Sequence, residues 1–189
     1  MRLSLSLSLS ILLLVTVIAG AVQRKGYLTE EELDLVRDAQ DVHQRVPLYL
    51  KLAEKRLVTL GLLESKEKPK KKKKDDKKSK DESTKIEDDS YLLDFTRAEL
   101  LRGYLQAIDE AMSNIEDAYE RKFDVRKSLE DLEKFTRETL PLLEHYEPKD
   151  EAEKPTLVDS ITKAKAAMDG AKDALEIVPK TEKKTEKKK

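Results

Sequence analysis

The chain has 189 residues, of which 41% are charged and 5% aromatic, and it contains no cysteine, no tryptophan, two histidines and five glycines. The absence of cysteine excludes disulfides, thiolate metal sites and a lipid-modified cysteine anchor. The glycines are isolated from one another, so the sequence contains no glycine-rich phosphate loop. Composition alone therefore excludes several large classes of enzyme.

The net charge of −1 is an average over unlike segments. Residues 66–85 carry 11 basic and 5 acidic side chains, and residues 180–189 carry 6 basic and 2 acidic ones. Residues 22–65 and 86–178 together carry 20 basic and 32 acidic side chains, a net charge of −12. This segregation bears on solubility and association rather than on the fold.

Residues 1–21 have the pattern of a signal peptide. Arg2 supplies a positive charge, residues 3–18 are mostly apolar, and residues 19–21 are the small residues that a signal peptidase accepts. We predict cleavage before Val22 and export to the periplasm or the extracellular medium. An uncleaved membrane anchor is the alternative, because about 20 apolar residues span a bilayer.

Residues 22–63 are predicted to form the first helical segment. Thr29 and Glu32 have the spacing of a capping box, which predicts a helix start. Apolar residues then recur at steps of three and four, which places them on one side of a helix. Gly61 followed by Leu62 predicts a Schellman-type helix end.

Pro47 lies inside this helical pattern. A proline removes one backbone hydrogen bond, so we expect a kink or a break near Arg45 and Val46. Pro47 also leaves the carbonyl of His43 without its helical donor. His43 is predicted at the flank of the apolar stripe, either as a boundary side chain held by a neighbour or as a pH-sensitive contact.

Two lysine-rich segments are predicted to be disordered, residues 64–89 and residues 179–189. The first has one apolar residue, Ile86, and neither can bury enough surface to offset the entropy of ordering. Lysine clusters gain on the order of 1 kcal/mol per residue near an anionic surface. The candidate contacts to such a surface are Lys70, Lys71, Lys72, Lys73, Lys74, Lys77 and Lys78.

Residues 90–178 are predicted to supply the remaining helices of the same domain. The phase of the apolar pattern slips past Phe123, so either one long helix continues or a joint lies near residues 122–128. Ser128 and Asp131 have the spacing of a capping pair for a separate helix, which favours the joint.

Residues 146–155 are predicted as a loop and residues 156–178 as the last helix. The alanines of this helix favour close packing against its neighbours. No strand-like alternation appears outside the signal peptide. The sequence therefore predicts an all-α fold, most simply an antiparallel bundle of three or four long amphipathic helices with a disordered Lys-rich linker and tail.

The two histidines give little support for a metal site. Glu-x-x-His pairs are absent, because Gln40 stands three residues before His43 and Leu142 three residues before His145. The adjacent acidic pairs fall on the polar side of each predicted helix, where carboxylates are hydrated rather than tuned for catalysis. The sequence therefore predicts no metal, no cofactor and no enzyme activity.

Two functions remain open at this point. The first is a non-enzymatic exported helical protein that binds another protein or self-associates in the cell envelope. The alternative is an envelope protein that associates with polyanions or a membrane surface through its lysine-rich segments. Nucleic acid is not an expected partner, since the lysines lack interleaved aromatic or arginine side chains.

Overall fold

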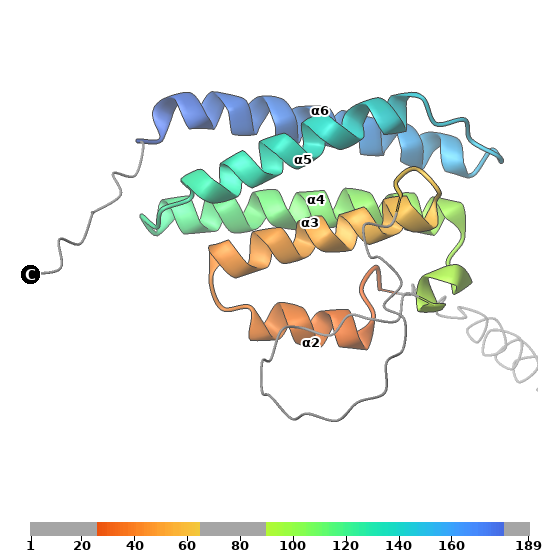
Figure 1. The fold of residues 1–189 in the computed structure, drawn as a ribbon, viewed down its shortest axis with the longest axis horizontal. Helices are drawn as coiled ribbons and strands as arrows, with labels where there is room; N and C mark the ends of the chain where they lie inside the picture. Colours follow the sequence, from red (N-terminus) through yellow and green to blue (C-terminus); the bar gives the residue numbers. More distant parts are fainter. Residues whose placement is uncertain (1–25, 65–89, 180–189) are drawn as a thin grey trace, which may run out of the picture.

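The structure is a computed structural model that describes residues 26–64 and 90–179. The described residues are all-helical and contain no strand, which confirms the predicted class (Figure 1). The predicted signal peptide, the lysine-rich linker from residue 65 and the tail from residue 180 lie outside the described residues. The elements are α2 (Glu30–Asp38), α3 (Val42–Thr59), the 3-10 helix η1 (Ser90–Asp94), α4 (Arg97–Glu120), α5 (Arg126–Glu144) and α6 (Glu153–Ile177).

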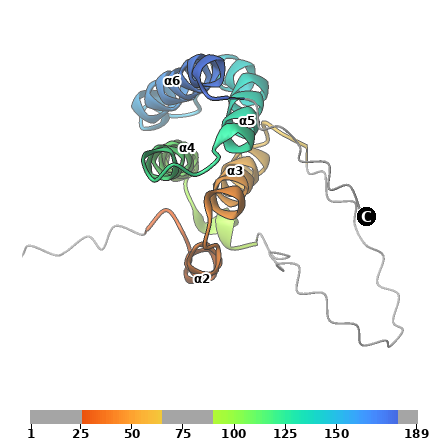
Figure 2. The same cartoon turned by 90° about the vertical axis from the view of Figure 1, so that its left-hand side faces the viewer.

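The four long helices lie side by side in two layers (Figures 1 and 2). α3 packs against α4 in one layer and α5 packs against α6 in the other, while α4 to α6 and α3 to α5 contacts join the layers. α3 and α5 run in one direction and α4 and α6 in the opposite one (Figure 1). The short α2 lies beside α3, on the side away from α5 and α6.

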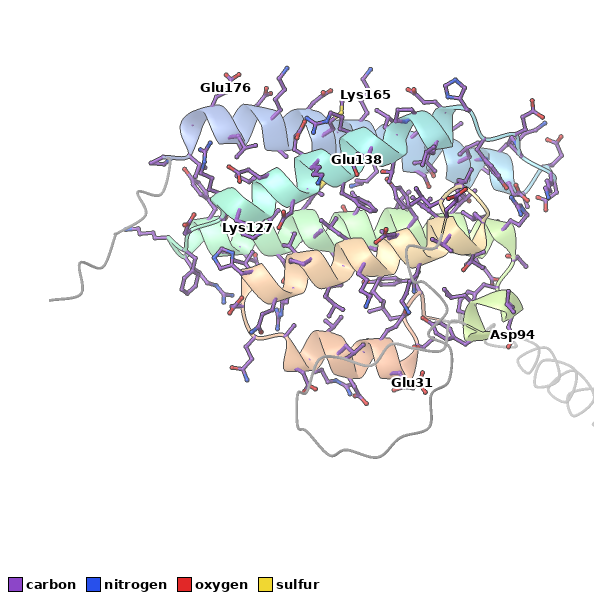
Figure 3. The ribbon with its side chains drawn as sticks, viewed as in Figure 1. Glu31, Asp94, Lys127, Glu138, Lys165 and Glu176 are labelled. Atoms are coloured by element: carbon purple, nitrogen blue, oxygen red, sulfur yellow. The ribbon has the colours of Figure 1, made fainter. Side chains whose placement is uncertain are left out.

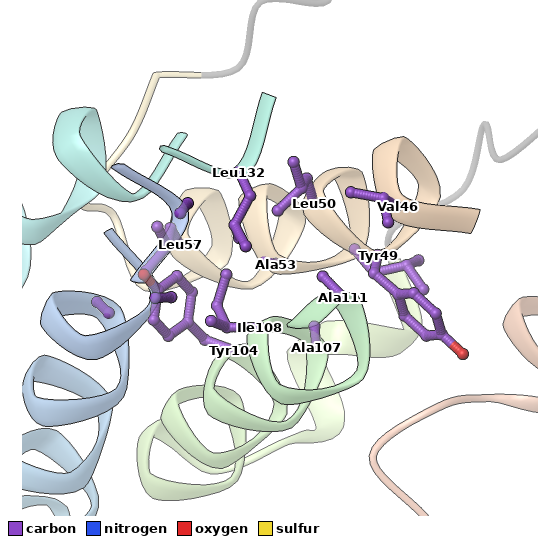
Figure 4. Close-up of a cluster of buried hydrophobic side chains, with 14 of the residues drawn as sticks. Val46, Tyr49, Leu50, Ala53, Leu57, Tyr104, Ala107, Ile108, Ala111 and Leu132 are labelled. Carbon is purple, nitrogen blue, oxygen red and sulfur yellow. The ribbon is translucent and has the colours of Figure 1, made fainter. Parts of the chain in front are cut away.

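Small buried residues form the contact between α3 and α4 (Figure 4). Ala53, Ala107 and Ala111 are fully buried there, which lets the two helix axes approach closely. Tyr104 fills the space toward α5, where its ring stacks on Phe135 with centroids 6.4 Å apart. Burial of Tyr104 raises the pKa of its phenol to about 12.

Both predicted ends of the first helical segment are confirmed. The backbone N–H of Thr29 donates to Glu32 Oε2 at 3.1 Å, and the N–H of Glu32 donates to Thr29 Oγ1 at 3.2 Å, which completes the capping box. At the other end Gly61 adopts a φ of 78°, and the N–H of Leu62 donates to the carbonyl of Leu57 at 2.9 Å. This is the Schellman geometry that the glycine predicted.

The predicted break near Arg45 and Val46 is wrong, because the segment divides earlier, between Asp38 and Val42. Asp41 caps α3 by accepting the N–H of Gln44 at 3.0 Å. Pro47 then falls inside α3 without interrupting it. The carbonyl that loses its donor belongs to an exposed turn near the helix start, where water can replace the missing bond.

The predicted joint after α4 is confirmed, because α4 ends at Glu120 and α5 begins at Arg126. A Schellman-type turn forms here without glycine: Lys122 has a φ of 64°, and the N–H of Phe123 donates to the carbonyl of Ala118 at 2.9 Å. The predicted capping role of Ser128 with Asp131 is wrong. Ser128 lies buried inside α5, whose N-cap residue makes no side-chain capping bond.

α6 starts earlier than predicted, at Glu153 instead of residue 156. Pro155 therefore lies in the first turn, where its missing N–H would have had no helical partner. Three alanines of α6, Ala164, Ala167 and Ala171, are buried against α4 and α5. The predicted close packing of this helix is thus observed along one face.

Candidate binding groove

An apolar groove of about 400 Å³ opens between α4, α5 and α6, near the end of the molecule where α4 turns into α5 and α6 ends. Glu116 is the single charged residue among its walls. Tyr119 and Ile177 line the groove and remain largely exposed, so the groove reaches solvent. The lining residues are Met112, Ile115, Glu116, Tyr119, Val125, Leu129, Leu132, Ala167, Gly170, Ala171, Ala174, Ile177 and Val178.

Small residues on α6 leave the space for this groove. Four of them have the spacing i, i+3, i+4 and i+7 and therefore share one face of the helix: Ala167, Gly170, Ala171 and Ala174. A Cβ atom built on Gly170 would meet no heavy atom within 4 Å. The alanine pattern predicted close packing of α6, but part of the same face borders open space instead.

Arg126 fixes one end of the groove. Its Nη1 donates to the carbonyls of Leu175 and Val178 at 3.3 and 2.7 Å, and its Nε lies 3.2 Å from Glu130 Oε1. A guanidinium at these carbonyls complements the negative end of the α6 dipole. The start of α5 is therefore tied to the end of α6, which holds two groove walls together.

A second, more polar hollow of about 580 Å³ lies between the start of α3 and the end of α4. His43 lines it as the second residue of α3 and is exposed. Asp117 and Arg121 of α4 line the same hollow. The pH-sensitive contact of His43 stays a prediction with these charged neighbours around it.

The other histidine, His145, is exposed at the end of α5, as predicted. Its Nδ1 lies 2.6 Å from the carbonyl of Pro141, four residues earlier. The bond closes the last turn of a helix that continues three residues past Pro141. This contact ties the His145 side chain to the end of α5.

A buried ion pair, which the sequence analysis did not predict, joins α2 to α3. Glu32 and Arg56 are each 1% exposed. Arg56 Nη1 donates to Glu32 Oε1 at 3.0 Å and Nη2 donates to Glu32 Oε2 at 2.7 Å, a bidentate arrangement. Tyr91 of η1 adds a hydroxyl donor to Glu32 at 2.5 Å, and the carbonyl of Tyr27 accepts from Arg56 at 2.6 Å.

Burial opposes the charge on Glu32, yet the hydrogen bonds and charge of Arg56 outweigh that effect and hold the pKa of this carboxyl below its ordinary value. Gly103 of α4 makes room for the guanidinium, since a Cβ there would lie 2.7 Å from Arg56 Nε. In the sequence, Glu32 is explained by its capping role and Gly103 is one isolated glycine. Their common contact with Arg56 can be seen only in the folded structure.

A similar cluster closes the opposite end from the groove. Glu153, with no exposed surface, accepts from the hydroxyl of Tyr146 at 2.5 Å and lies 3.4 Å from Arg97 Nε. Arg97 also donates to Tyr146 at 2.7 Å and covers its ring. Burial, together with the hydrogen bond to Glu153, raises the pKa of the Tyr146 phenol. This cluster joins α4 to the loop before α6.

Both buried carboxylates are paired with an arginine of the fold, although Glu153 Oε1 has only its ion pair with Arg97 and accepts no hydrogen bond. Neither Glu32 nor Glu153 lines the groove, and both are bound by an arginine and a tyrosine. Within residues 26–64 and 90–179, no group of three or more His, Asp or Glu side chains could hold a metal ion. In the same residues, no helix is both long and apolar enough to cross a bilayer.

The candidate lysine contacts at positions 70–74, 77 and 78 lie outside the described residues, so the structure does not place them. The groove was missed by sequence reasoning, because alanines on a helix face predict packing as readily as they predict space.

Comparison with protein-family models, with curated proteins and with solved structures finds no match to this chain. The site therefore stands on its own geometry.

Proposed function

We propose that the protein is a non-enzymatic, exported protein in which α3 to α6 form a four-helix bundle that binds another protein in the cell envelope. The groove between α4, α5 and α6 is the proposed binding surface. The single observation that carries this proposal is an apolar groove of about 400 Å³ that is open to solvent in an otherwise highly charged chain.

Apolar surface left in contact with water favours association, at about 25 cal/mol per Å² that becomes buried. Three helices wall the groove, so its shape suits a ridge of apolar side chains from a partner helix at positions i, i+3, i+4 and i+7. The small α6 residues Ala167, Gly170 and Ala174 allow such a helix to approach closely.

The charges of the protein support binding over catalysis. A catalytic acid or base needs a partly dry site in which its proton is available to a substrate. Here the two buried carboxylates are bound within the fold, and the carboxylate that lines the groove, Glu116, is exposed. The groove therefore offers a partner an apolar, concave contact surface with one charged side chain, Glu116, at its wall.

Site-specific photocrosslinking in the producing cell tests this function. A photoreactive residue at Tyr119 borders the groove, whereas the same residue at Val158 is comparably exposed on α6 but does not line it. We expect a discrete protein adduct from position 119 and none from position 158. Gly170→Leu fills the groove and should abolish the adduct, whereas Ala166→Leu, on the exposed side of α6, should preserve it. Equal adducts from both positions would contradict the proposal.

A second candidate function rests on the segregation of charge. Residues 66–85 and 180–189 carry net charges of +6 and +4, which favours attraction to an anionic envelope surface. Deletion of both segments should abolish salt-sensitive pelleting with anionic vesicles. Pelleting that survives both the deletion and high salt would exclude this candidate.

A further inference from the structure

We infer that the partner of the groove is a cationic amphipathic helix of another protein, with an apolar ridge that enters the groove and lysine or arginine side chains beside that ridge. This inference rests on the proposed function, because it names the chemistry of the partner for the same surface. Its support comes from the charges at the mouth of the groove, from the two helix ends beside it and from the length of its walls.

The mouth of the groove lies between α4 and α6, and α5 forms its floor. The α5 residues that line the groove are all buried: Val125, Leu129 and Leu132. The exposed lining residues come from the two other helices: Glu116, Tyr119, Gly170 and Ile177. A partner therefore enters between α4 and α6 and meets the charges that these two helices expose.

Both sides of this mouth expose carboxylates. Glu116 lines the groove and Glu120 follows it by four residues, so the two share a side of α4. On α6, Asp173 stands three residues after Gly170 and four before Ile177, which places it beside two exposed lining residues. Within residues 26–64 and 90–179, none of these three carboxylates has an ion-pair partner. Each is therefore available to a cation of a partner.

The basic side chains around the groove are fewer, and most of them are engaged elsewhere. Residues 112–132 and 167–179 include every lining residue and carry 5 basic and 9 acidic side chains, a net charge of −4. Arg126 bonds the end of α6, and Lys127 pairs with a carboxylate of its own helix. Arg121 lines the polar hollow toward α3. A basic partner would neutralise this excess of acid and fix its own register by doing so.

Two helices end with their negative poles beside the mouth. α4 ends at Glu120 and α6 at Ile177, and neither has a basic side chain in its last turn. The carboxyl end of a helix carries about half a negative charge, which lysine or arginine stabilises. Arg126 reaches the α6 carbonyls from α5, on the floor side of the groove. Lysines of a partner helix would supply the missing positive charge on the mouth side.

The groove has the length of a helix ridge with apolar residues at positions i, i+3, i+4 and i+7. Its α4 wall runs from Met112 to Tyr119, roughly 10 Å at about 1.5 Å per residue. Its α6 wall runs from Ala167 to Val178, roughly 17 Å on the same scale. The ridge also spans seven residue steps, roughly 10 Å, so two turns of a partner helix fit along both walls.

The lysine-rich segments of this chain have the charge for the groove but not the apolar side chains. Residues 66–85 and 180–189 contain no Ala, Val, Leu, Ile, Met or aromatic residue, so neither can supply the ridge. A second copy docked through the groove would bring one acidic mouth to another, which like-charge repulsion opposes. These charges therefore favour a different protein as the occupant.

Binding of two designed peptides to the chain from Val22 onward tests the inference. Both are helices with leucines at i, i+3, i+4 and i+7; one carries lysines beside this ridge and its twin carries glutamates. Fluorescence anisotropy of the labelled peptides gives their affinities, and the binding that Gly170→Leu loses is the part that depends on the groove. We expect the lysine peptide to bind there at least about tenfold more tightly than its twin, with an affinity that falls as salt rises. Ala166→Leu, on the exposed side of α6, should keep this binding.

Charge reversal at the mouth gives an independent measurement. Glu120→Lys combined with Asp173→Lys should remove the preference for the lysine peptide, because the mouth then repels it. Glu31→Lys combined with Glu138→Lys is the matched control, since it changes the net charge equally at exposed positions of α2 and α5 (Figure 3). This control should keep the preference, and circular dichroism should show that both double variants keep their helices.

Equal groove-dependent binding of the two peptides would overturn the cationic partner. So would lysine-peptide binding that survives Gly170→Leu, or a loss as large in the control reversal as in the mouth reversal. A mass that doubles in sedimentation equilibrium without peptide, but not in Gly170→Leu, would make a second copy the occupant and overturn it as well. If neither peptide binds but position 119 still crosslinks to a discrete protein, the cationic helix is wrong and the proposed function stands. If neither occurs, both are wrong.

Discussion

The α2 side of the molecule and its groove end differ in what they bury and what they expose to water. On the α2 side, two full charges are removed from water, and Glu32, Arg56 and Tyr91 satisfy one another in a single geometry. At the groove end, apolar side chains that could be buried are left open to solvent. Figure 3 labels charged side chains on the outside of several helices, among them Glu31, Glu138 and Lys165, all exposed.

This difference affects how firmly each region is held in place. A buried ion pair adds little net stability compared with an apolar core, but loss of one partner is costly, so the pair holds α2 in one position. The groove has no such pair of charges, and most of its α6 wall consists of alanine and glycine, whose side chains do not extend past Cβ. Paired charges fix one region, and the other leaves apolar surface open to solvent.

The largest expected effect is on the buried pair. Arg56→Met keeps much of the side-chain volume but leaves Glu32 buried without its cation, so the free energy of unfolding should fall by about 3–5 kcal/mol. Urea denaturation measures this loss. The double variant Glu32→Met with Arg56→Met removes both charges and should recover much of it; a double variant as unstable as the single one would show that the charges themselves matter little.

The same carboxyl should make stability depend on pH. The pKa of Glu32 is lower in the folded protein than its value of 4.5 in an unfolded chain, so its stabilisation is present above about pH 4.5 and is lost as the pH falls through the folded pKa. Denaturation between pH 6 and pH 3 should show this loss. Glu32→Gln should reduce the slope, and an unchanged slope would assign the acid sensitivity to other carboxylates.

Gly103→Ala extends the comparison to a neighbour of the pair. The added Cβ would lie 2.7 Å from Arg56 Nε, and the guanidinium cannot withdraw without breaking its bonds to Glu32. We expect a loss of about 1–3 kcal/mol, the usual effect of overpacking, measured by urea denaturation. Alanine favours helix over glycine, so a gain in stability would mean that Arg56 moves freely.

Local signals in the sequence predicted the helix class and several helix ends. Thr29 with Glu32 and Gly61 with Leu62 specify their turns through nearby backbone groups, so their geometry follows from spacing alone. The break before α3 was misplaced because Pro47 is a conspicuous signal. The Asp41 cap is a weaker signal in the sequence. Gln44 reinforces this cap by accepting the N–H of Gln40.

The candidate site was much less predictable, for a physical reason. The groove depends on how three consecutive helices, α4, α5 and α6, pack together, and on the volume that alanine and Gly170 leave unfilled. The pairing of Glu32 with Arg56 likewise spans 24 residues. Periodicity tells which face of a helix is apolar, but not whether a neighbour fills the space against that face.

Asp41→Ala tests the cap that separates α2 from α3. Loss of the side-chain acceptor for the N–H of Gln44 should lower the free energy of unfolding by about 1 kcal/mol. Urea denaturation gives the value, and Asp41→Asn should retain most of the stability because its amide oxygen still accepts this bond. A loss as large in the asparagine variant would show that the charge, and not the cap, is responsible.

The smallest expected effect has the opposite sign and comes from the groove. Gly170→Ala is the same substitution as Gly103→Ala, but here the new methyl group meets no atom within 4 Å. Alanine lowers the entropy of the unfolded chain and favours the helix, so the free energy of unfolding should rise by about 0.4–1 kcal/mol. Thermal denaturation measures this gain. If the two glycine substitutions shifted stability in the same direction, the contrast between a filled and an open region would not hold, because packing around the new methyl group is what distinguishes them.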